Sequence, residues 1–122
     1  MTEFVKRAPR QAHITGDHPE TWAALKANAI GDAIEMSSGG DIDVQVTGTF
    51  GGAVLIIQGS NTVEVAGEYV ALTGPFGGPL EFADSSTIKR AASGARWVRP
   101  SVFGGDETTS LKVAMLVRRT KR

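Results

Sequence analysis

The sequence of 122 residues predicts an all-β protein: a single β-sandwich, jelly-roll or immunoglobulin-like, with seven to eight short antiparallel strands. Three observations lead to this fold class. Apolar and polar residues alternate along several short segments, as in strands with one buried face. The chain contains 15 glycines, which favour frequent turns over long helices. Turn signals separate the candidate strands at intervals of roughly 8–12 residues, and no long helical pattern lies between them.

The segment 17–31, DHPETWAALKANAIG, has two interpretations. Helix signals are a capping box at its start, Trp22 and Leu25 at a spacing of three, and Gly31 as a stop. The same residues could form an extended strand, ETWAAL, followed by a turn and a second strand, DAIEM. The residues alone leave both open.

The central part of the chain contains the clearest strands. In DIDVQVTGTF, which begins at Asp41, the alternation places three apolar residues on one face: Ile42, Val44 and Val46. A second run, AVLIIQ, follows Gly51 and Gly52 and is apolar on both faces. We expect these two strands to form a tight hairpin, because glycine reaches the positive φ values that such turns need. Further candidate strands are 68–73, 79–83 and 87–90.

Two more strands are expected near the C-terminus. GARWVRPSVF places Trp97 and Arg99 on one face and Val98 and Pro100 on the other. Because proline cannot donate a ladder hydrogen bond, we expect an edge strand or a strand end at Pro100. The last strand, SLKVAMLVRR, has an alternating inward face: Leu111, Val113, Met115 and Val117.

The sequence Phe-Gly-Gly occurs three times, in TGTFGG (47–52), TGPFGG (73–78) and VFGG (102–105). A phosphate-binding loop would need Gly-Lys-Ser/Thr before a helix, which follows none of them. The flanks of the three copies do not align, so they are not internal repeats. We therefore interpret each copy as a strand that ends in an apolar residue before a glycine turn, with the phenylalanines capping the core.

No catalytic, cofactor or metal site is expected, and the protein is interpreted as a non-enzyme. The chain has no cysteine, which excludes disulfides and thiolate ligands. His13 and His18 are five residues apart, a spacing that aligns them on neither a helix nor a strand face, so we interpret them as exposed loop residues. No G-x-S-x-G nucleophile motif is present. Trp22, Tyr69 and Trp97 could stack on sugar rings, which makes carbohydrate binding an alternative function.

The formal net charge is zero but unevenly distributed. Residues 1–10 and 118–122 together carry seven basic residues and one acidic one, whereas the remaining body carries six basic and twelve acidic residues. We expect the basic ends to bind an acidic partner. The candidate partner-binding residues are Lys6, Arg7, Arg10, Arg118, Arg119, Lys121 and Arg122. Nucleic-acid binding is not expected, because there is no basic stripe and there are few aromatic residues. A membrane span is not expected either, because the longest apolar run is AVLII.

Several motifs follow one another in a fixed order. They are V-x-V-x-G-T-F at Val44–Phe50, G-S-N at Gly59–Asn61, R-W-V-R-P at Arg96–Pro100, G-G-D before Thr-Thr-Ser at Gly104–Ser110, and a strand ending in basic residues at Leu111–Arg119. In this order they resemble small proteins encoded in the head-gene modules of tailed bacteriophages. The resemblance covers residues 41–119, and its relatives place an extended segment at 17–31, which favours the strand there.

The resemblance implies a virion structural protein of cement or decoration type. Such a protein binds the outer surface of the major capsid protein lattice, stabilises the expanded head and forms a homo-oligomer, a dimer or a trimer. It is located on the capsid surface of the virion after assembly in the host cytoplasm. The expected domains are an N-terminal arm (1–16), a β-sandwich (17–119) and a basic tail (120–122). Alternatives are another virion component, from the neck, tail or head fibre, and a carbohydrate-binding β-sandwich module.

Overall fold

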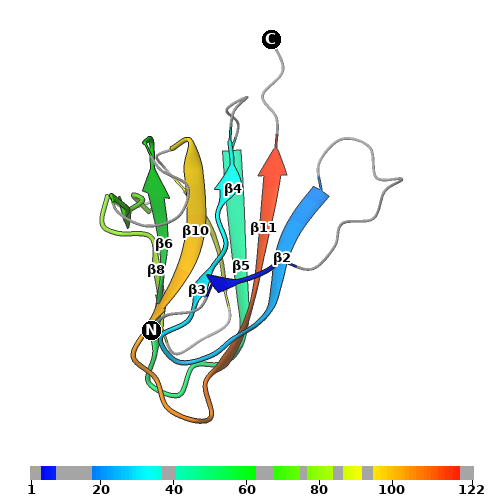
Figure 1. The fold of residues 1–122 in the computed structure, drawn as a ribbon, viewed down its shortest axis with the longest axis vertical. Coiled ribbons are helices and arrows are strands. Elements are labelled where there is room, and N and C mark those ends of the chain that lie inside the picture. Colours follow the sequence, from blue (N-terminus) through cyan, green and yellow to red (C-terminus); the bar gives the residue numbers. More distant parts are fainter. Residues whose placement is uncertain are drawn as a thin grey trace.

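The chain folds into two β-sheets that pack face to face (Figure 1), so the predicted all-β sandwich is confirmed. The structure is a computed structural model and describes residues 4–7, 18–36, 41–62, 68–74, 77–83, 87–91 and 95–118. Eleven strands lie in these residues. Two of them, each two residues long, were not expected from the sequence: β1 (Phe4–Val5) and β3 (Ile30–Gly31). The short strand β4 (Ile34–Glu35) lies in DAIEM, the second strand of the extended interpretation.

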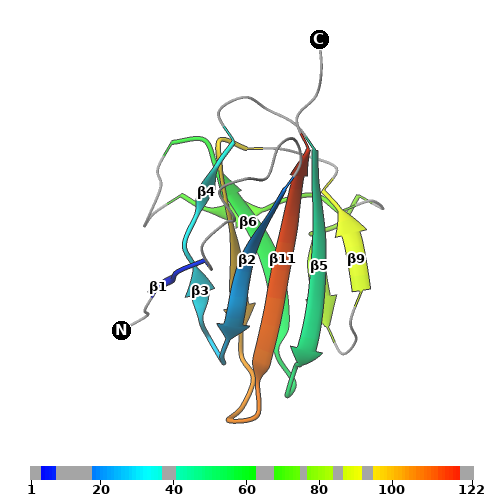
Figure 2. The ribbon, with the colours of Figure 1, turned by 90° about the vertical axis from the view of Figure 1, so that its right-hand side faces the viewer.

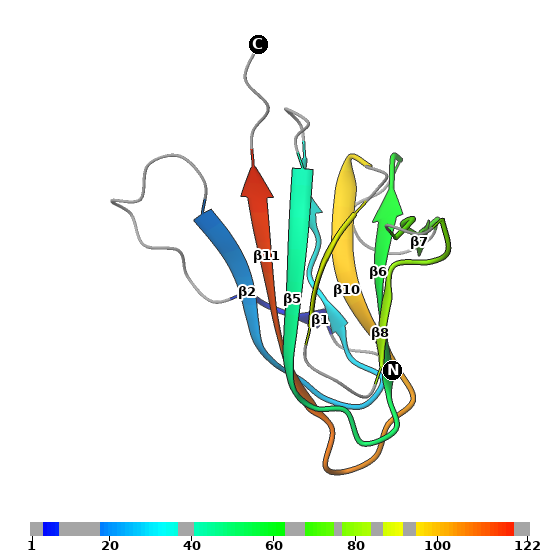
Figure 3. The ribbon, with the colours of Figure 1, turned by 180° about the vertical axis from the view of Figure 1, so that it is seen from behind.

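The larger sheet has seven strands. At its centre, β10 (Trp97–Phe103) and β6 (Val54–Ser60) pair antiparallel along their whole length. The other edge of β10 pairs with β3 and β4, and β1 adds to β3 in parallel orientation. The far edge of β6 pairs with β7 (Val70–Ala71) and β8 (Glu81–Ala83). Figure 3 shows this sheet beside the smaller one from behind.

The smaller sheet has four strands in the order β2–β11–β5–β9, seen from its outer side in Figure 2. Their bounds are His18–Leu25 for β2, Ser110–Arg118 for β11, Asp41–Thr49 for β5 and Thr87–Arg90 for β9. The central strands β11 and β5 pair over nine residues. The predicted alternation holds, since Ile42, Val44 and Val46 are buried while Gln45 is exposed.

The core fills the space between the two sheets. Its fully buried large side chains are Trp22, Phe82, Leu25, Leu55, Ile57, Leu80, Leu111, Met115, Val44, Val46, Val98 and Val113. The three described members of the expected inward face of the last strand are therefore buried as predicted. The side chain of Val117 lies outside the described part of the structure.

The expected hairpin at Gly51 and Gly52 is wrong, because its two strands lie in different sheets. Both edges of β5 are taken by β11 and β9, and both edges of β6 by β10 and by β7 with β8. The turn itself is as tight as predicted: Ala53 N donates to Phe50 O at 2.9 Å, and the two glycines have φ of 58° and 85°. The glycines therefore carry the chain from one sheet to the other.

Three such crossings meet at one end of the sandwich, the lower end in Figure 1. They comprise residues 26–29, 50–53 and 104–109. The first and third are joined by two bonds, from Asn28 N to Gly104 O (3.2 Å) and from Gly104 N to Asn28 Oδ1 (2.9 Å). The second and third are joined by the hydroxyl of Thr109, which donates to Phe50 O at 2.9 Å and accepts from Asp106 N at 2.9 Å.

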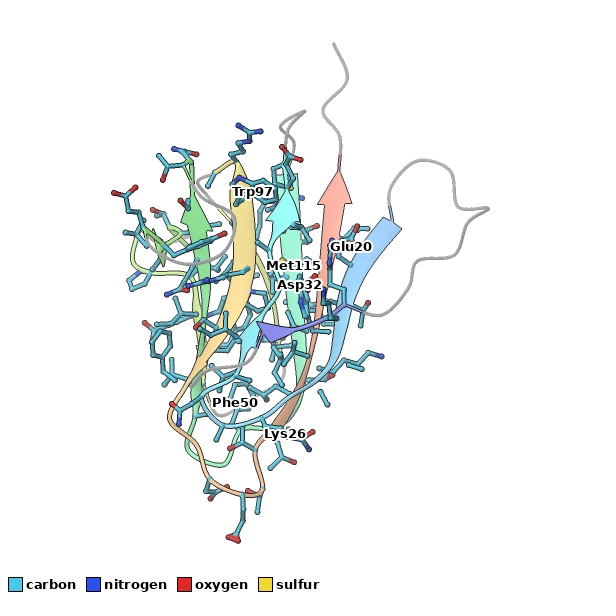
Figure 4. All side chains as sticks on the ribbon, in the orientation of Figure 1. Glu20, Lys26, Asp32, Phe50, Trp97 and Met115 are labelled. Atoms are coloured by element: carbon cyan, nitrogen blue, oxygen red, sulfur yellow. The ribbon has the colours of Figure 1, made fainter. Side chains whose placement is uncertain are left out.

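The expectation that the phenylalanines before each glycine pair cap the core holds for one of them. Phe50 is buried between the sheets near the turns (Figure 4). Phe103 is 46% exposed, because the strand alternation of β10 places it on the outer side of the larger sheet. Phe76 lies outside the described residues.

The segment 17–31 contains a strand, β2, where the sequence also carried helix signals. The pairing of β2 with β11 shifts by a β-bulge, so that Val113 faces Trp22 and Leu111 faces Leu25. The bulge adds a residue on β2 and lets two side chains at a spacing of three both point inward. The spacing that indicated a helix is thus the signature of a bulged strand. His18 begins this strand rather than lying in a loop, and His13 lies outside the described residues.

Pro100 lies in a central strand, not at an edge or a strand end as expected. The N and O atoms of its partner Ile57 bond to the β7–β8 side, so Pro100 presents its own nitrogen to the opposite side. There the neighbouring strand is interrupted between β3, which ends at Gly31, and β4, which begins at Ile34. The missing N–H of proline therefore breaks no ladder hydrogen bond.

Candidate interaction surface

One lateral seam of the sandwich, between β2 and β3, is closed by Arg7. This residue lies just after β1, and its guanidinium contacts Glu20 Oε1 at 3.1 Å and Asp32 Oδ2 at 3.2 Å. The other oxygen of Asp32 accepts a hydrogen bond from Trp22 Nε1 at 2.8 Å. Figure 4 shows Glu20 and Asp32 in this region, between β2 and β3. The first described part of the expected arm, residues 4–7, is thus attached to both sheets.

The opposite seam, between β9 and β8, is closed by Lys89. Its ammonium donates to Glu81 O at 2.7 Å and lies 5.1 Å from the centre of the Phe82 ring. Both outer strands of the smaller sheet therefore carry an inward-pointing charge: Glu20 on β2 and Lys89 on β9. Inward charges on edge strands oppose the addition of a further strand. The edges of the smaller sheet are therefore unsuited to strand addition, which leaves the faces of the sheets as candidate interaction surfaces.

The outer face of the smaller sheet is mostly small and polar. Gln45 and Ala114 lie at its centre, and the Asp43–Arg90 ion pair (2.9 Å) lies beside them. Its one strongly exposed large apolar residue among those described is Ile88, at 62%. Such a face offers little area for tight binding of a partner.

The outer face of the larger sheet is different, and we call its outward residues on β3, β6 and β10 the β10 face: Ile30, Val54, Ile56, Gln58, Trp97, Arg99, Ser101 and Phe103. The register places them in rows. One row joins Phe103 and Val54, and the next joins Ile30, Ser101 and Ile56. This half of the face is almost wholly apolar.

The centre of the β10 face is an ordered cation–aromatic stack. The guanidinium of Arg99 lies 3.7 Å from the centre of the Tyr69 ring and donates from Nε to Gln58 Oε1 at 3.1 Å. The residue is only 8% exposed. Burial lowers the pKa of Arg99 from its usual value, and the nearby Tyr69 opposes this shift; arginine nevertheless stays charged at neutral pH. The stack holds a positive charge in place on an aromatic platform.

Trp97 lies at the end of the β10 face away from the glycine turns (Figure 4). The guanidinium of Arg96 lies 5.9 Å from the centre of its ring and donates to Glu35 Oε2 from two nitrogens, at 3.2 and 3.0 Å. Tryptophan, tyrosine, arginine and phenylalanine are the residues enriched in protein–protein interfaces. The β10 face is therefore the best candidate for protein binding among the described residues.

The turn end of the sandwich carries a hydrogen-bonded carboxylate. Asp106 Oδ1 accepts from the hydroxyl of Thr108 at 2.6 Å and from its N–H at 2.8 Å. These two bonds favour the charged form and lower the pKa of Asp106, the hydroxyl bond contributing most. The carboxylate thereby orders the loop between β10 and β11.

The candidate partner-binding residues predicted from the sequence lie in different parts of the chain. Lys6 is exposed, and Arg7 is bound within the fold as described. Arg118 ends β11, with its side chain outside the described part of the structure. The others, Arg10, Arg119, Lys121 and Arg122, lie outside the described residues. The alternation in the sequence placed Trp97 and Arg99 correctly on one face. The same alternation continues to Phe103, which was the available signal for the apolar half of that face.

Two features are absent from the described part of the chain. No three His, Cys, Asp or Glu side chains gather there in a way that could hold a metal ion. No helix long and apolar enough to cross a membrane was found in those residues.

Comparison with known proteins gives one informative likeness. No protein-family model matches the chain, and no curated protein matches it significantly. The fold is similar to the crystal structure of the SPBc2 prophage-derived protein YomS, with a TM-score of 0.64 and 16% sequence identity. The similarity covers 88% of this chain and 98% of the YomS chain. At this identity it shows the shared two-sheet fold.

Proposed function

We propose that the protein is a non-enzymatic structural component of a tailed-bacteriophage virion. The observation that carries this proposal is the fold shared with YomS, a prophage-derived protein, along nearly the whole of both chains. It agrees with the order of sequence motifs that resembles phage head-module proteins. The first rests on the path of the backbone and the second on the order of residue motifs.

More specifically, we propose a cement or decoration protein on the outer surface of the major capsid protein lattice. A protein that binds the expanded shell in preference to other states stabilises that shell by mass action. The sandwich suits this role as a rigid body: its three sheet crossings are bonded together, and Arg7 and Lys89 close its two seams. β11 ends at Arg118, at the end of the sandwich opposite the glycine turns (Figure 1).

The experiment that tests the proposal is a measurement of copy number in purified particles. The chain would be quantified against the major capsid protein by gel densitometry and mass spectrometry. A ratio near one, or near a simple fraction of one, supports a cement protein spread over the lattice. A ratio below about one in twenty would instead favour a neck, tail or head-fibre component. Absence from particles would contradict the virion proposal and leave glycan binding, tested on a glycan panel by tryptophan fluorescence, as the next candidate.

The contact with the capsid is tested separately by neutralising the basic C-terminal residues. Replacing Arg118, Arg119, Lys121 and Arg122 by glutamine should weaken binding to expanded heads, because it removes four positive charges from one end. The matched control removes two exposed lysines from the folded body, Lys26 and Lys112. Equal binding by the wild type and the C-terminal variant would exclude the tail from the contact.

A further inference from the structure

The β10 face exposes apolar area that the fold itself does not use. Phe103 is 46% exposed, and its row neighbour Val54 and the next-row residues Ile30 and Ile56 are half-buried. Ser101 points outward between these larger neighbours yet is only 2% exposed, so a small residue lies below the level of the large ones around it. Contiguous apolar patches of this kind mark sites of protein association.

Next to the patch, the polar part of the β10 face is already ordered. Arg99, itself only 8% exposed, stacks on the half-buried Tyr69 ring and bonds to the amide of Gln58, so Tyr69 is held in place before a partner covers it. An ordered arginine–tyrosine pair beside a phenylalanine is a typical centre of a protein interface. The face therefore combines an apolar patch with a preorganised polar one.

The two sides of the face carry opposite charges. On the β8 side, Glu81 is exposed and pairs in register with Ile56, so it points to the outer side. On the β1 side, Val5 packs against the core and Arg7 reaches the seam, and the alternation between them places the exposed Lys6 on the outer side. Acid on one flank and base on the other make the face complementary to itself.

We propose that a second copy of this chain docks on the β10 face, sheet against sheet, about a two-fold axis that runs along the strands. This rotation exchanges the two flanks, so the Glu81 flank of each copy faces the Lys6 flank of the other with the two residues one row apart, and the apolar patches meet in the middle. A contact of this symmetry is isologous and closes as a dimer. The outer face of the smaller sheet lacks such an arrangement, since its charges Asp43 and Arg90 are paired within one copy.

The size of the face sets the expected affinity. The four spacings of ~4.8 Å between the five strand positions from β1 to β8, and seven residues of β10 at ~3.3 Å, give roughly 440 Å² per copy and about 900 Å² in all. This is near the lower limit of specific interfaces, about 1,000 Å². The dimer is therefore weak, with a dissociation constant in the micromolar range or above, and it forms more fully where many copies are held at high local concentration.

The first test is sedimentation velocity of the purified protein over a concentration series up to about 1 mM. The wild type should shift from monomer to dimer, and Phe103→Ser should weaken the dimer by at least about tenfold. The matched control is Ile88→Ser, a more exposed apolar residue (62% against 46%) on the other sheet, which should leave the equilibrium unchanged. Both substitutions are at exposed positions, and thermal unfolding checks that both variants fold.

The second test exchanges charges at Glu81 and Lys6 to test the proposed two-fold symmetry. Glu81→Lys alone and Lys6→Glu alone each place like charges opposite one another twice per dimer, and each should weaken self-association by about tenfold. An equimolar mixture of the two variants should recover dimers, because every contact in the mixed pair again joins opposite charges. The mixed species is identified by mass with one variant isotope-labelled.

Three results would overturn the proposal. They are a wild type that stays monomeric throughout the series, a dimer weakened by Ile88→Ser but not by Phe103→Ser, and a mixture no more associated than its components. All measurements use the isolated protein, so they do not depend on whether it is found in virions. Conversely, a failure of the copy-number experiment would leave the dimer unaffected.

Discussion

The hydroxyl of Thr109 links the turn at residues 50–53 to the loop at residues 104–109 by hydrogen bonds. Removing this hydroxyl is a direct test of how much these bonds stabilise the fold. Thr109 is 1% exposed, and its Oγ1 both donates to Phe50 O and accepts from Asp106 N, each at 2.9 Å. Replacing it with valine keeps the shape of the side chain but removes both hydrogen bonds of the hydroxyl; Phe50 O keeps its other donor, Ala53 N. We expect a loss of about 2 kcal/mol in the free energy of unfolding, because each of the two bonds contributes about 0.5–1.5 kcal/mol.

The assay is urea unfolding followed by tryptophan fluorescence, with thermal unfolding as a second measurement. With an m-value of about 2 kcal/mol/M, the midpoint should fall by about 1 M. The melting temperature should fall by roughly 6–10 °C for a domain of this size.

Thr109→Ser is the matched control, since it keeps the hydroxyl and removes one methyl, at a cost of about 1 kcal/mol. The reasoning predicts that valine is worse than serine although it removes no volume. A valine variant as stable as the wild type, or more stable than the serine variant, would show that this hydrogen bond does not hold the turns together.

Three more predictions follow from other contacts. Gly31→Ala should destabilise the fold by about 1–3 kcal/mol and change tryptophan fluorescence, because the new Cβ would lie 2.6–2.8 Å from the Trp22 indole and from a proline ring; an unchanged emission spectrum would contradict this contact. Arg7→Gln should lower the free energy of unfolding by about 1–3 kcal/mol, less than the loss of a fully buried ion pair, because Arg7 is 31% exposed. The neighbouring substitution Lys6→Gln should leave the free energy of unfolding almost unchanged. Calorimetry of the two variants tests this difference. The pKa of Asp106 is lowered in the folded state, so its contribution to stability is fully present above the unfolded pKa of about 3.9 and is lost as the pH falls through the lower folded value. Asp106→Asn should therefore remove part of the acid sensitivity below about pH 4, and identical pH profiles of unfolding for the two proteins would refute the assignment.

The sequence predicted which residues face inward more successfully than which strands are neighbours. Alternation is a local property, so the buried faces of β5 and β11 follow from residue types alone. Strand partners depend on residues far apart in the chain. The Gly51–Gly52 turn has the backbone angles of a hairpin, yet the two strands it joins lie in different sheets, where each pairs with other strands.

The helix signals in β2 show a second limit. A spacing of three between Trp22 and Leu25 fits a helix face, and it also fits a strand with one extra residue. Only the partner strand β11 decides between the two. Local spacing therefore left the two states open, whereas the resemblance to phage proteins favoured the extended one.

The interaction surface was predictable in part. The alternation placed Trp97 and Arg99 on the same face, but the stack of Arg99 on Tyr69 joins residues 30 positions apart and appears only in the folded chain. The role of Arg7 was missed for the same reason, because its partners Glu20 and Asp32 come together only when two sheets meet. Deleting residues 1–10 would therefore disturb the fold, so charge substitutions are the better test of the basic ends.

The alternation of the chain between the two sheets has a consequence for biosynthesis. β5 finds its central neighbour only when β11 has been made, and β11 begins 61 residues after β5 ends. β2 also pairs with β11. No two long strands that follow one another directly in the sequence pair with each other. Nearly all of the domain must therefore be synthesised before the smaller sheet can form. Closing loops of this length is slow compared with forming a helix or a hairpin. Nascent chains will therefore expose their apolar strands until β11 has been synthesised.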